Sequence, residues 1–281
     1  MVLAPLDNEV FFKKVFTDRA VFKAFVKDIV GIEVEPDSIE TEKSFQPKVG
    51  NINFKYDIFA EDHQKRVVIE IQKVEYDHNF DRFLHYHLKA ITEQQRSSGD
   101  YSVEKTVYTI VIMTAPYKLN SKTRQFYNDE VLISNLNPKN LEGIERKLFN
   151  HELIYLNPNY KSEDTPQNYR DWLDLIYESI YNPENPKINT ENEGIKRAKE
   201  IGSYENISPE EWEQAKIEVG KRKVIILELE AERFKIAKRM MTLNLDDNTI
   251  SQATAMSLEE IEFVRSNLHL IDENSKGLKE K

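Results

Sequence analysis

Two carboxylates and an amide, Asp57, Glu70 and Gln72, lie in a stretch, residues 54–72, that consists of two short runs of apolar and β-branched residues separated by a polar turn. This pattern predicts a β-hairpin. If the hairpin is symmetric about its middle, Asp57 lies directly opposite Glu70, with the two Cβ atoms roughly 5 Å apart. Two facing carboxylates repel each other, and a bound cation or a raised pKa is the usual means of offsetting that repulsion.

The same three side chains have a simpler explanation. Because side chains alternate along a strand, Glu70 and Gln72 share one face, while Ile69 and Ile71 point to the other. A polar face of this kind is also what an antiparallel hairpin needs for solvation alone. The hairpin by itself favours solvation, and the rest of the chain has to supply the evidence for chemistry.

Further elements are predicted around the hairpin. Apolar residues that recur at spacings of three and four indicate helices, and continuous apolar runs indicate buried strands. We therefore expect a helix over residues 9–30 that stops at Gly31, a short strand near Ile39, the hairpin, a helix over residues 77–97, a buried strand over residues 107–114 and a further strand over residues 147–156.

Six short motifs follow one another along these elements. They occupy residues 9–16 (EVFFKKVF), 56–62 (YDIFAED), 68–72 (VIEIQ), 82–86 (RFLHY), 93–95 (EQQ) and 99–101 (GDY). In this order, over about the first 156 residues, they resemble the PD-(D/E)XK nuclease superfamily, in its branch of recombination-promoting nucleases or putative transposases.

The resemblance implies an α/β (α+β) restriction-endonuclease-like core, with a mixed β-sheet flanked by helices and an α-helical C-terminal region. It also implies a DNA endonuclease that hydrolyses phosphodiester bonds with Mg²⁺, or with Mn²⁺ in its place, in bacterial recombination or the movement of mobile elements. By this resemblance, Asp57, Glu70 and the backbone carbonyl of Ile71 hold the ion. Glu9 is an outer or second-metal ligand, and Gln72 orients water or phosphate.

The superfamily pattern has a lysine at the position of Gln72, although glutamine is usual in this branch. An amide can orient a water molecule but cannot take its proton. Strand alternation sends Lys73 to the opposite face, so Arg82 on the next helix is the better candidate for neutralising a phosphate oxygen. An ion pair of Arg82 with Asp77 or Asp81 is an equally weighted alternative.

Composition limits the other classes of function. The chain has no cysteine, which excludes disulfides and thiolate metal sites, and its six histidines show no zinc-ligand spacing. The net charge is −10, so DNA binding would need a local basic patch and would be sensitive to salt. No apolar run is long enough to span a membrane and the N-terminus lacks a signal-peptide core, so we expect a cytoplasmic protein without membrane contact.

The C-terminal half is helical and acidic. We expect a helix over residues 168–181, a long helix from the capping box at residues 208–211 to about Leu243, and two short helices over residues 246–269. The basic residues of the long helix mark either a DNA-facing surface or, as we prefer, a solvated face with ion pairs. The two short helices resemble a helix-turn-helix, but the acidic second helix equally favours a docking or dimerising pair.

These expectations divide the chain into a nuclease-like domain over residues 1–160, a helix and linker over 161–209, a helical region with a helix-turn-helix-like end over 210–271, and a disordered tail over 272–281. The expected partners are DNA and a second copy of the chain, bound through the C-terminal helices. Two alternatives to an endonuclease remain: a catalytically inactive nuclease fold that binds DNA or protein, and a protein-interaction role led by the acidic helical half.

Overall fold

The computed structural model describes residues 1–45, 54–73, 80–95, 102–117, 127–254 and 256–266. The chain forms two compact units, residues 1–215 and residues 216–281, which are described separately below.

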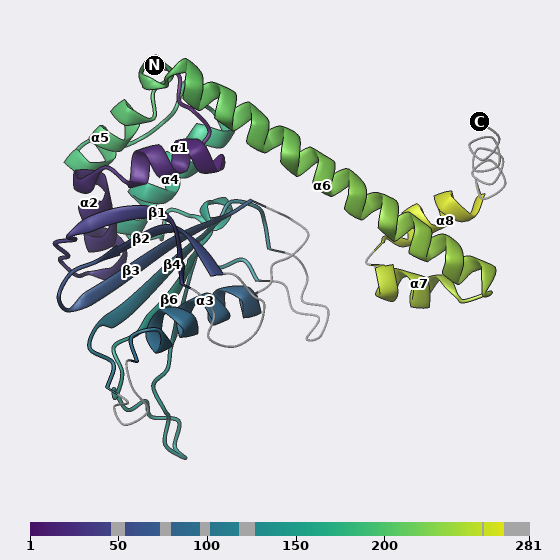
Figure 1. Ribbon diagram of the computed structural model, residues 1–281, viewed down its shortest axis with the longest axis horizontal. Coiled ribbons are helices and arrows are strands. Elements are labelled where there is room, and N and C mark those ends of the chain that lie inside the picture. Colours follow the sequence, from purple (N-terminus) through teal and green to yellow (C-terminus); the bar gives the residue numbers. More distant parts are fainter. Residues whose placement is uncertain (46–53, 74–79, 96–101, 118–126, 255, 267–281) are drawn as a thin grey trace. The chain divides into compact units, whose positions relative to one another are not determined.

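The first unit contains one mixed six-stranded sheet, visible in Figure 1. Its strands are β1 (Ser38–Phe45), β2 (Phe54–Glu61), β3 (Lys65–Gln72), β4 (Thr106–Met113), β5 (Val131–Asn135) and β6 (Glu152–Leu156). Their order across the sheet is β1-β2-β3-β4-β6-β5. Strand β4 is parallel to both β3 and β6, and the other neighbours are antiparallel. The predicted fold, a mixed sheet flanked by helices with further helices at the C-terminal end, is confirmed.

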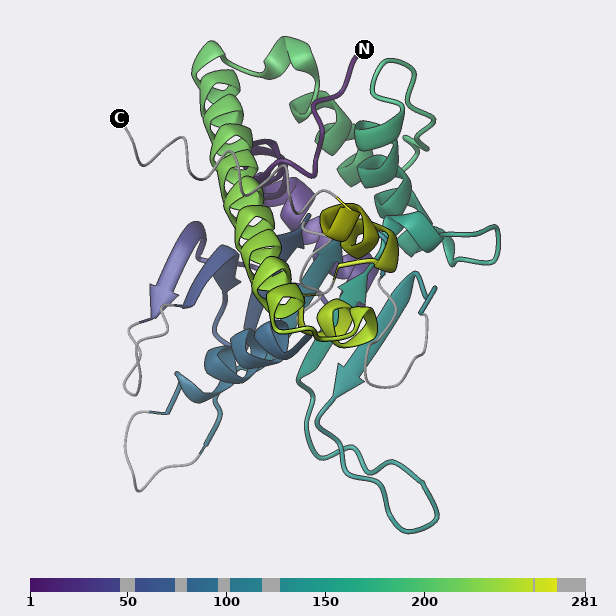
Figure 2. The same ribbon diagram turned by 90° about the vertical axis from the view of Figure 1, so that its right-hand side faces the viewer.

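Helices cover both faces of the sheet (Figures 1 and 2). On one face lie α1 (Glu9–Phe16), α2 (Arg19–Val30), α4 (Gln167–Tyr181) and α5 (Glu193–Ile201); on the other lies α3 (Phe80–Thr92). The alternation of side chains along β3 follows from this arrangement. Ile69 and Ile71 belong to the core under α1, whereas Val68 packs with Tyr86 of α3.

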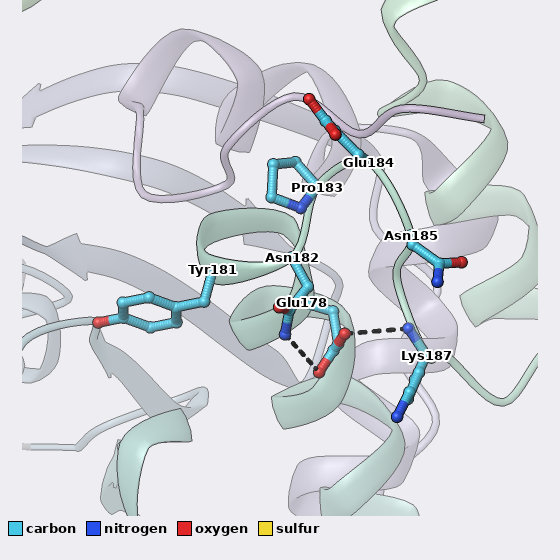
Figure 3. Close-up of a pocket in the computed structure, with 7 residues that line it drawn as sticks. All are labelled: Glu178, Tyr181, Asn182, Pro183, Glu184, Asn185 and Lys187. Atoms are coloured by element: carbon cyan, nitrogen blue, oxygen red, sulfur yellow. Dashed lines mark hydrogen bonds between the residues drawn. The ribbon is translucent and has the colours of Figure 1, made fainter.

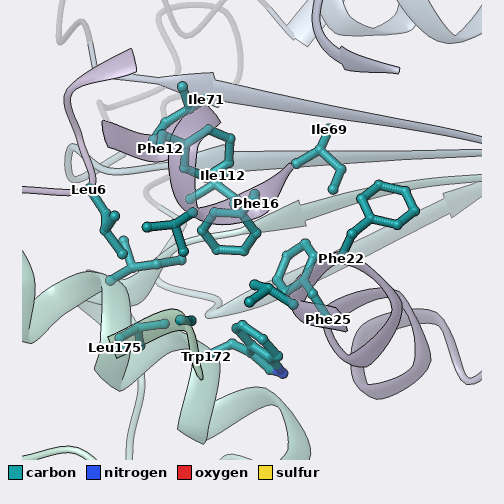
Figure 4. Close-up of a cluster of buried hydrophobic side chains, with 14 of the residues drawn as sticks. Leu6, Phe12, Phe16, Phe22, Phe25, Ile69, Ile71, Ile112, Trp172 and Leu175 are labelled. Carbon is teal, nitrogen blue, oxygen red and sulfur yellow. The ribbon is translucent and has the colours of Figure 1, made fainter. Parts of the chain in front are cut away.

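The larger core joins residues that are far apart in sequence. Trp172 of α4 is fully buried, with its ring centroid 5.0 Å from that of Phe25 and 5.9 Å from that of Phe16 (Figure 4). Ile195 of α5 and Ala215 belong to the same cluster. The boundary expected at residue 160 therefore falls inside the first unit, because α4 and α5 supply part of its core.

Three predicted elements differ in their limits. The helix expected over residues 9–30 is broken into α1 and α2, because the Asp18 side chain caps α2 by accepting hydrogen bonds from the Ala20 and Val21 N–H groups. The helix expected over residues 77–97 ends at Thr92, and its predicted start and end lie outside the described residues. The strand expected over residues 147–156 begins only at Glu152, and β5 was not predicted.

The second unit contains the greater part of α6 (Pro209–Thr242), then α7 (Asp247–Thr254) and α8 (Leu258–Ser266). The predicted capping box at residues 208–211 is present at the start of α6, and a second one starts α8: the Ser208 and Ser257 side chains accept from the N–H groups of Glu211 and Glu260, whose carboxylates accept from the serine N–H groups. A small core of its own joins the helices, formed by Ala237, Met241, Ile250, Met256, Ile261 and Val264. The first unit also contains two short 3₁₀ turns, Pro158–Tyr160 and Tyr204–Asn206.

Candidate active site

The predicted hairpin register is present. Ile58 pairs with Ile69, and the ladder continues through three further pairs to Glu61 and Arg66 at the turn. Asp57 and Glu70 are the next pair in this register, and here hydrogen bonds between the backbone and the two side chains connect the strands. The Asp57 N–H donates to Glu70 Oε1 at 3.1 Å, and the Ile71 N–H donates to Asp57 Oδ2 at 3.0 Å. The two carboxylates are thus fixed to each other's strands.

This arrangement confines two negative charges in a poorly solvated place. Glu70 is only 2% exposed. Burial and the neighbouring Asp57 raise the pKa of the Glu70 carboxyl well above its ordinary value. Burial, together with the charge of Glu9, raises the pKa of Asp57 to about 6, although the hydrogen bond from Ile71 opposes the shift. The raised pKa values mean that burial and mutual repulsion disfavour the ionised forms of both carboxyls, which a bound cation would favour.

Two more carboxylates come from other elements. Glu9 of α1, Glu42 of β1 and Asp57 each offer an oxygen, and these three oxygens lie within 4.8 Å of one another. This acidic cluster could hold a metal ion. Its membership differs from the expected ligand set, because Glu42 joins Glu9 and Asp57, while Glu70 and Ile71 are attached through the hydrogen bonds to Asp57.

Glu42 was not predicted as a site residue. In the β1–β2 register, Thr41 pairs with Ile58 and Lys43 with Tyr56, which places Glu42 across from Asp57. Its φ angle is +57°, in the left-handed region that costs a residue with a side chain roughly 1 kcal/mol or more. The sequence carries no signal for this, because only long-range strand pairing brings residue 42 to residue 57.

Lys13 of α1 was also missed. Its ammonium forms hydrogen-bonded ion pairs with the carboxylates of Glu9 and Glu42 and lies 3.9 Å from Asp57 Oδ1. Glu9 and Lys13 are four residues apart on one helix and so share a face. That spacing is visible in the sequence, but it is common on helix surfaces and does not reveal the strand residues beside it.

The remaining predicted residues lie on the α3 side of β3. The Arg82 guanidinium donates to Gln72 Oε1 at 3.5 Å through Nη1 and to the Tyr86 hydroxyl at 3.1 Å through Nη2. Arg82 and Gln72 are therefore neighbours. The expected alternative partner Asp77 lies outside the described residues. Lys73 forms an ion pair with Asp7 at 2.6 Å.

A pocket at the C-terminal end of α4 offers less chemistry (Figure 3). Glu178, one of its two acidic lining residues, accepts hydrogen bonds from the Lys187 N–H and the Asn182 side chain. These contacts tie the loop after α4 to the helix, so the pocket is explained by structure.

The fold and the acidic cluster together define a nuclease-like α/β protein of the restriction-endonuclease kind. Comparison with known families agrees: residues 10–224 match the PD-(D/E)XK nuclease family transposases, and the chain belongs to that family. The match extends well beyond the 156 residues that carry the motifs and takes in α4, α5 and the start of α6. No curated protein and no solved structure matches the chain. Among the described residues, no helix has the length and apolar character that crossing a membrane requires.

Proposed function

We propose that this protein is a metal-dependent endonuclease that hydrolyses phosphodiester bonds in DNA. The observation that carries the proposal is the interlocked pair Asp57 and Glu70, which lies beside the two further carboxylates of the acidic cluster. Grouping carboxylates in this way costs free energy unless positive charge offsets theirs. Membership of a nuclease family makes a divalent cation the expected source of that charge.

The residues fit a hard divalent cation. The donors are carboxylate oxygens, which Mg²⁺ and Mn²⁺ prefer, and the chain has no thiolate to favour a softer metal. We assign Asp57, Glu70 and the Ile71 carbonyl as ligands, with Glu9 as an outer or second-metal ligand and Glu42 as an addition. When bound, the cation would lower the pKa of a water molecule and offset charge on the phosphate.

The chain's own polar groups then position the substrate. The Gln72 amide orients water or a phosphate oxygen, and it keeps this orientation because Arg82 donates to its Oε1. The Arg82 guanidinium is charged throughout, so it stabilises negative charge on the phosphate and does not accept a proton. Tyr86, which accepts from two Arg82 nitrogens, holds the guanidinium in place.

A plasmid-nicking assay tests the proposal. We expect cleavage with Mg²⁺ or Mn²⁺, none with EDTA, and none by Asp57→Ala or Glu70→Ala, because each variant loses a central ligand. Asp57→Asn and Glu70→Gln serve as matched variants that keep the size of the side chain. Divalent-ion binding without cleavage under any condition would favour the alternative, a nuclease fold that acts as a binding module. Undiminished nicking by either variant would overturn the site assignment.

The proposal extends to partners. DNA is the substrate that the family implies, in recombination or transposition. We also propose that two copies pair through the C-terminal helices. In support, α6 exposes apolar side chains at Ile217, Val224, Leu227 and Phe234, which repeat at spacings of seven and three. Light scattering on the full chain and on Leu227→Glu tests this, since a monomeric full chain would remove the dimer from the proposal.

A further inference from the structure

The Lys13 ammonium contacts every carboxylate of the acidic cluster. Its ammonium pairs with Glu9 and Glu42 and lies 3.9 Å from Asp57 Oδ1, so it touches all three carboxylates that could hold a metal ion. The Lys13 side chain is only 15% exposed. These contacts are those of a counter-ion held inside the site and not of a solvated surface pair.

The other lysines near the site pair with carboxylates that do not belong to the acidic cluster, or are more exposed than Lys13. Lys14, the next residue on α1, pairs with Glu211 at 2.6 Å. Lys73 pairs with Asp7. Lys55 also pairs with Glu42, but 57% of its side chain is exposed. Lys13 is thus the lysine whose ammonium occupies the middle of the cluster.

We propose that the Lys13 ammonium changes partner during the reaction. It pairs with the carboxylates of the acidic cluster before a divalent cation binds, and it donates to a phosphate oxygen of the DNA afterwards. An ammonium and a divalent cation compete for the oxygens of Glu9 and Glu42, so a cation that takes these oxygens in addition to Asp57 displaces Lys13 from them. The displaced ammonium, anchored one helical turn from Glu9, remains beside Asp57, where a phosphate has to approach. This inference rests on the proposed endonuclease function.

Removing the Lys13 ammonium should therefore have opposite effects on metal binding and on DNA cleavage, and measuring both tests the proposal. In Lys13→Met the competing ammonium is gone, so Mn²⁺ binding measured by calorimetry without DNA should become about three- to tenfold tighter. Cleavage of DNA at saturating Mn²⁺ under single-turnover conditions should become roughly a hundredfold slower, because one donor to the phosphate is lost. Lys13→Arg keeps the positive charge, so it should bind Mn²⁺ about as the unaltered protein does and recover part of the cleavage rate.

Lys14→Met is the matched control, because it removes an ammonium from the same helix and leaves the acidic cluster untouched. It should change neither quantity. A purely structural role for Lys13 would weaken both Mn²⁺ binding and cleavage in Lys13→Met, and that result, or two unchanged quantities, would overturn the inference. If Lys13→Met does not fold, Lys13→Arg decides: Mn²⁺ binding more than about tenfold weaker than in the unaltered protein contradicts the proposal. A protein that binds Mn²⁺ but has no nuclease activity would instead disprove the proposed function, and with it the second partner of Lys13.

Discussion

Asp57 and Glu70 are each bound to the backbone of the other's strand, at the point where the ladder between β2 and β3 ends. Glu70 accepts from the Asp57 N–H, and Asp57 accepts from the N–H of the residue after Glu70. Each carboxylate thereby uses one oxygen to hold the strand ends together. The hydrogen bonds explain how two like charges can be kept at adjacent positions without a ladder to fix them.

The first prediction concerns the cost of that arrangement. The pKa of Asp57 is about 6 in the folded protein, against an ordinary value of 3.8. A carboxyl whose pKa is raised by folding contributes stability that is present below pH 3.8 and lost as the pH rises through about 6. Asp57→Asn should therefore raise the melting temperature of the metal-free protein at pH 7.5, by about 5 °C, and give no gain at pH 4.

Asn is the appropriate replacement because its side-chain oxygen can still accept from the Ile71 N–H. Differential scanning fluorimetry in EDTA at the two pH values measures the effect. A lower melting temperature for Asp57→Asn at pH 7.5 would mean that the ion pairing of Asp57 outweighs its burial. In excess Mg²⁺ the unaltered protein should have the higher melting temperature of the two, because only its site is stabilised by binding the ion.

A second prediction separates Arg82 from Lys73. Arg82→Ala should slow cleavage about a hundredfold, since it removes a permanent charge and also the donor that orients Gln72. Lys73→Ala should leave the rate nearly unchanged, because Lys73 pairs with Asp7. Single-turnover cleavage with saturating metal measures both. A large loss in Lys73→Ala together with a normal rate in Arg82→Ala would reverse the two assignments.

The sequence was sufficient for those parts of the site that depend on local pattern. Alternating residues around a polar turn fixed the hairpin register, and the register brought Asp57 to Glu70. Apolar periodicity placed β4 and α4 to within a residue or two. The motif resemblance predicted the fold and the family.

The parts that were missed depend on long-range pairing. Glu42 reaches Asp57 only through the β1–β2 register, and its left-handed φ angle has no signature in a glutamate. β5 has only five residues, and its exposed side chains lack the pattern of a buried strand. The break between α1 and α2 was overlooked because apolar spacing continues across Asp18 and hides its capping role.

A third prediction concerns acid stability. His87 is 1% exposed; its Nδ1 lies 2.9 Å from Thr109 Oγ1, and its Nε2 has no hydrogen-bond partner among the described residues. Burial, with a contribution from His151, lowers the pKa of His87 from 6.5 to about 4. The stability contributed by neutral His87 is thus complete above pH 6.5 and is lost as the pH falls toward 4.

The unaltered protein should accordingly lose up to about 3 kcal/mol of unfolding free energy from this residue between pH 7 and pH 4. His87→Asn, which can keep the contact to Thr109, should lose less over the same range, although it starts from a lower stability because it leaves a gap. Urea titrations at several pH values measure the difference. The control is His85→Asn, an exposed position on the same helix, which should follow the unaltered protein. Parallel pH profiles for His87→Asn and the unaltered protein would refute this role.

The last prediction concerns where the chain can be cut. A chain that ends at residue 160 lacks Trp172, whose ring contacts Phe16 and Phe25, and lacks all of α4 and α5. It should be insoluble or unfolded, because this removes part of the larger core.

A chain that ends at Gly220 retains the first compact unit and should fold, with a cooperative melting transition. The DNA-facing interpretation of the basic residues of α6 predicts that this chain binds DNA more weakly than the full chain at matched salt, because those beyond Gly220 are gone, whereas the solvated-face interpretation predicts equal affinity. Equal DNA affinity for the two lengths would show that the C-terminal unit does not contribute to binding, and a folded chain ending at residue 160 would show that α4 and α5 are dispensable for the core.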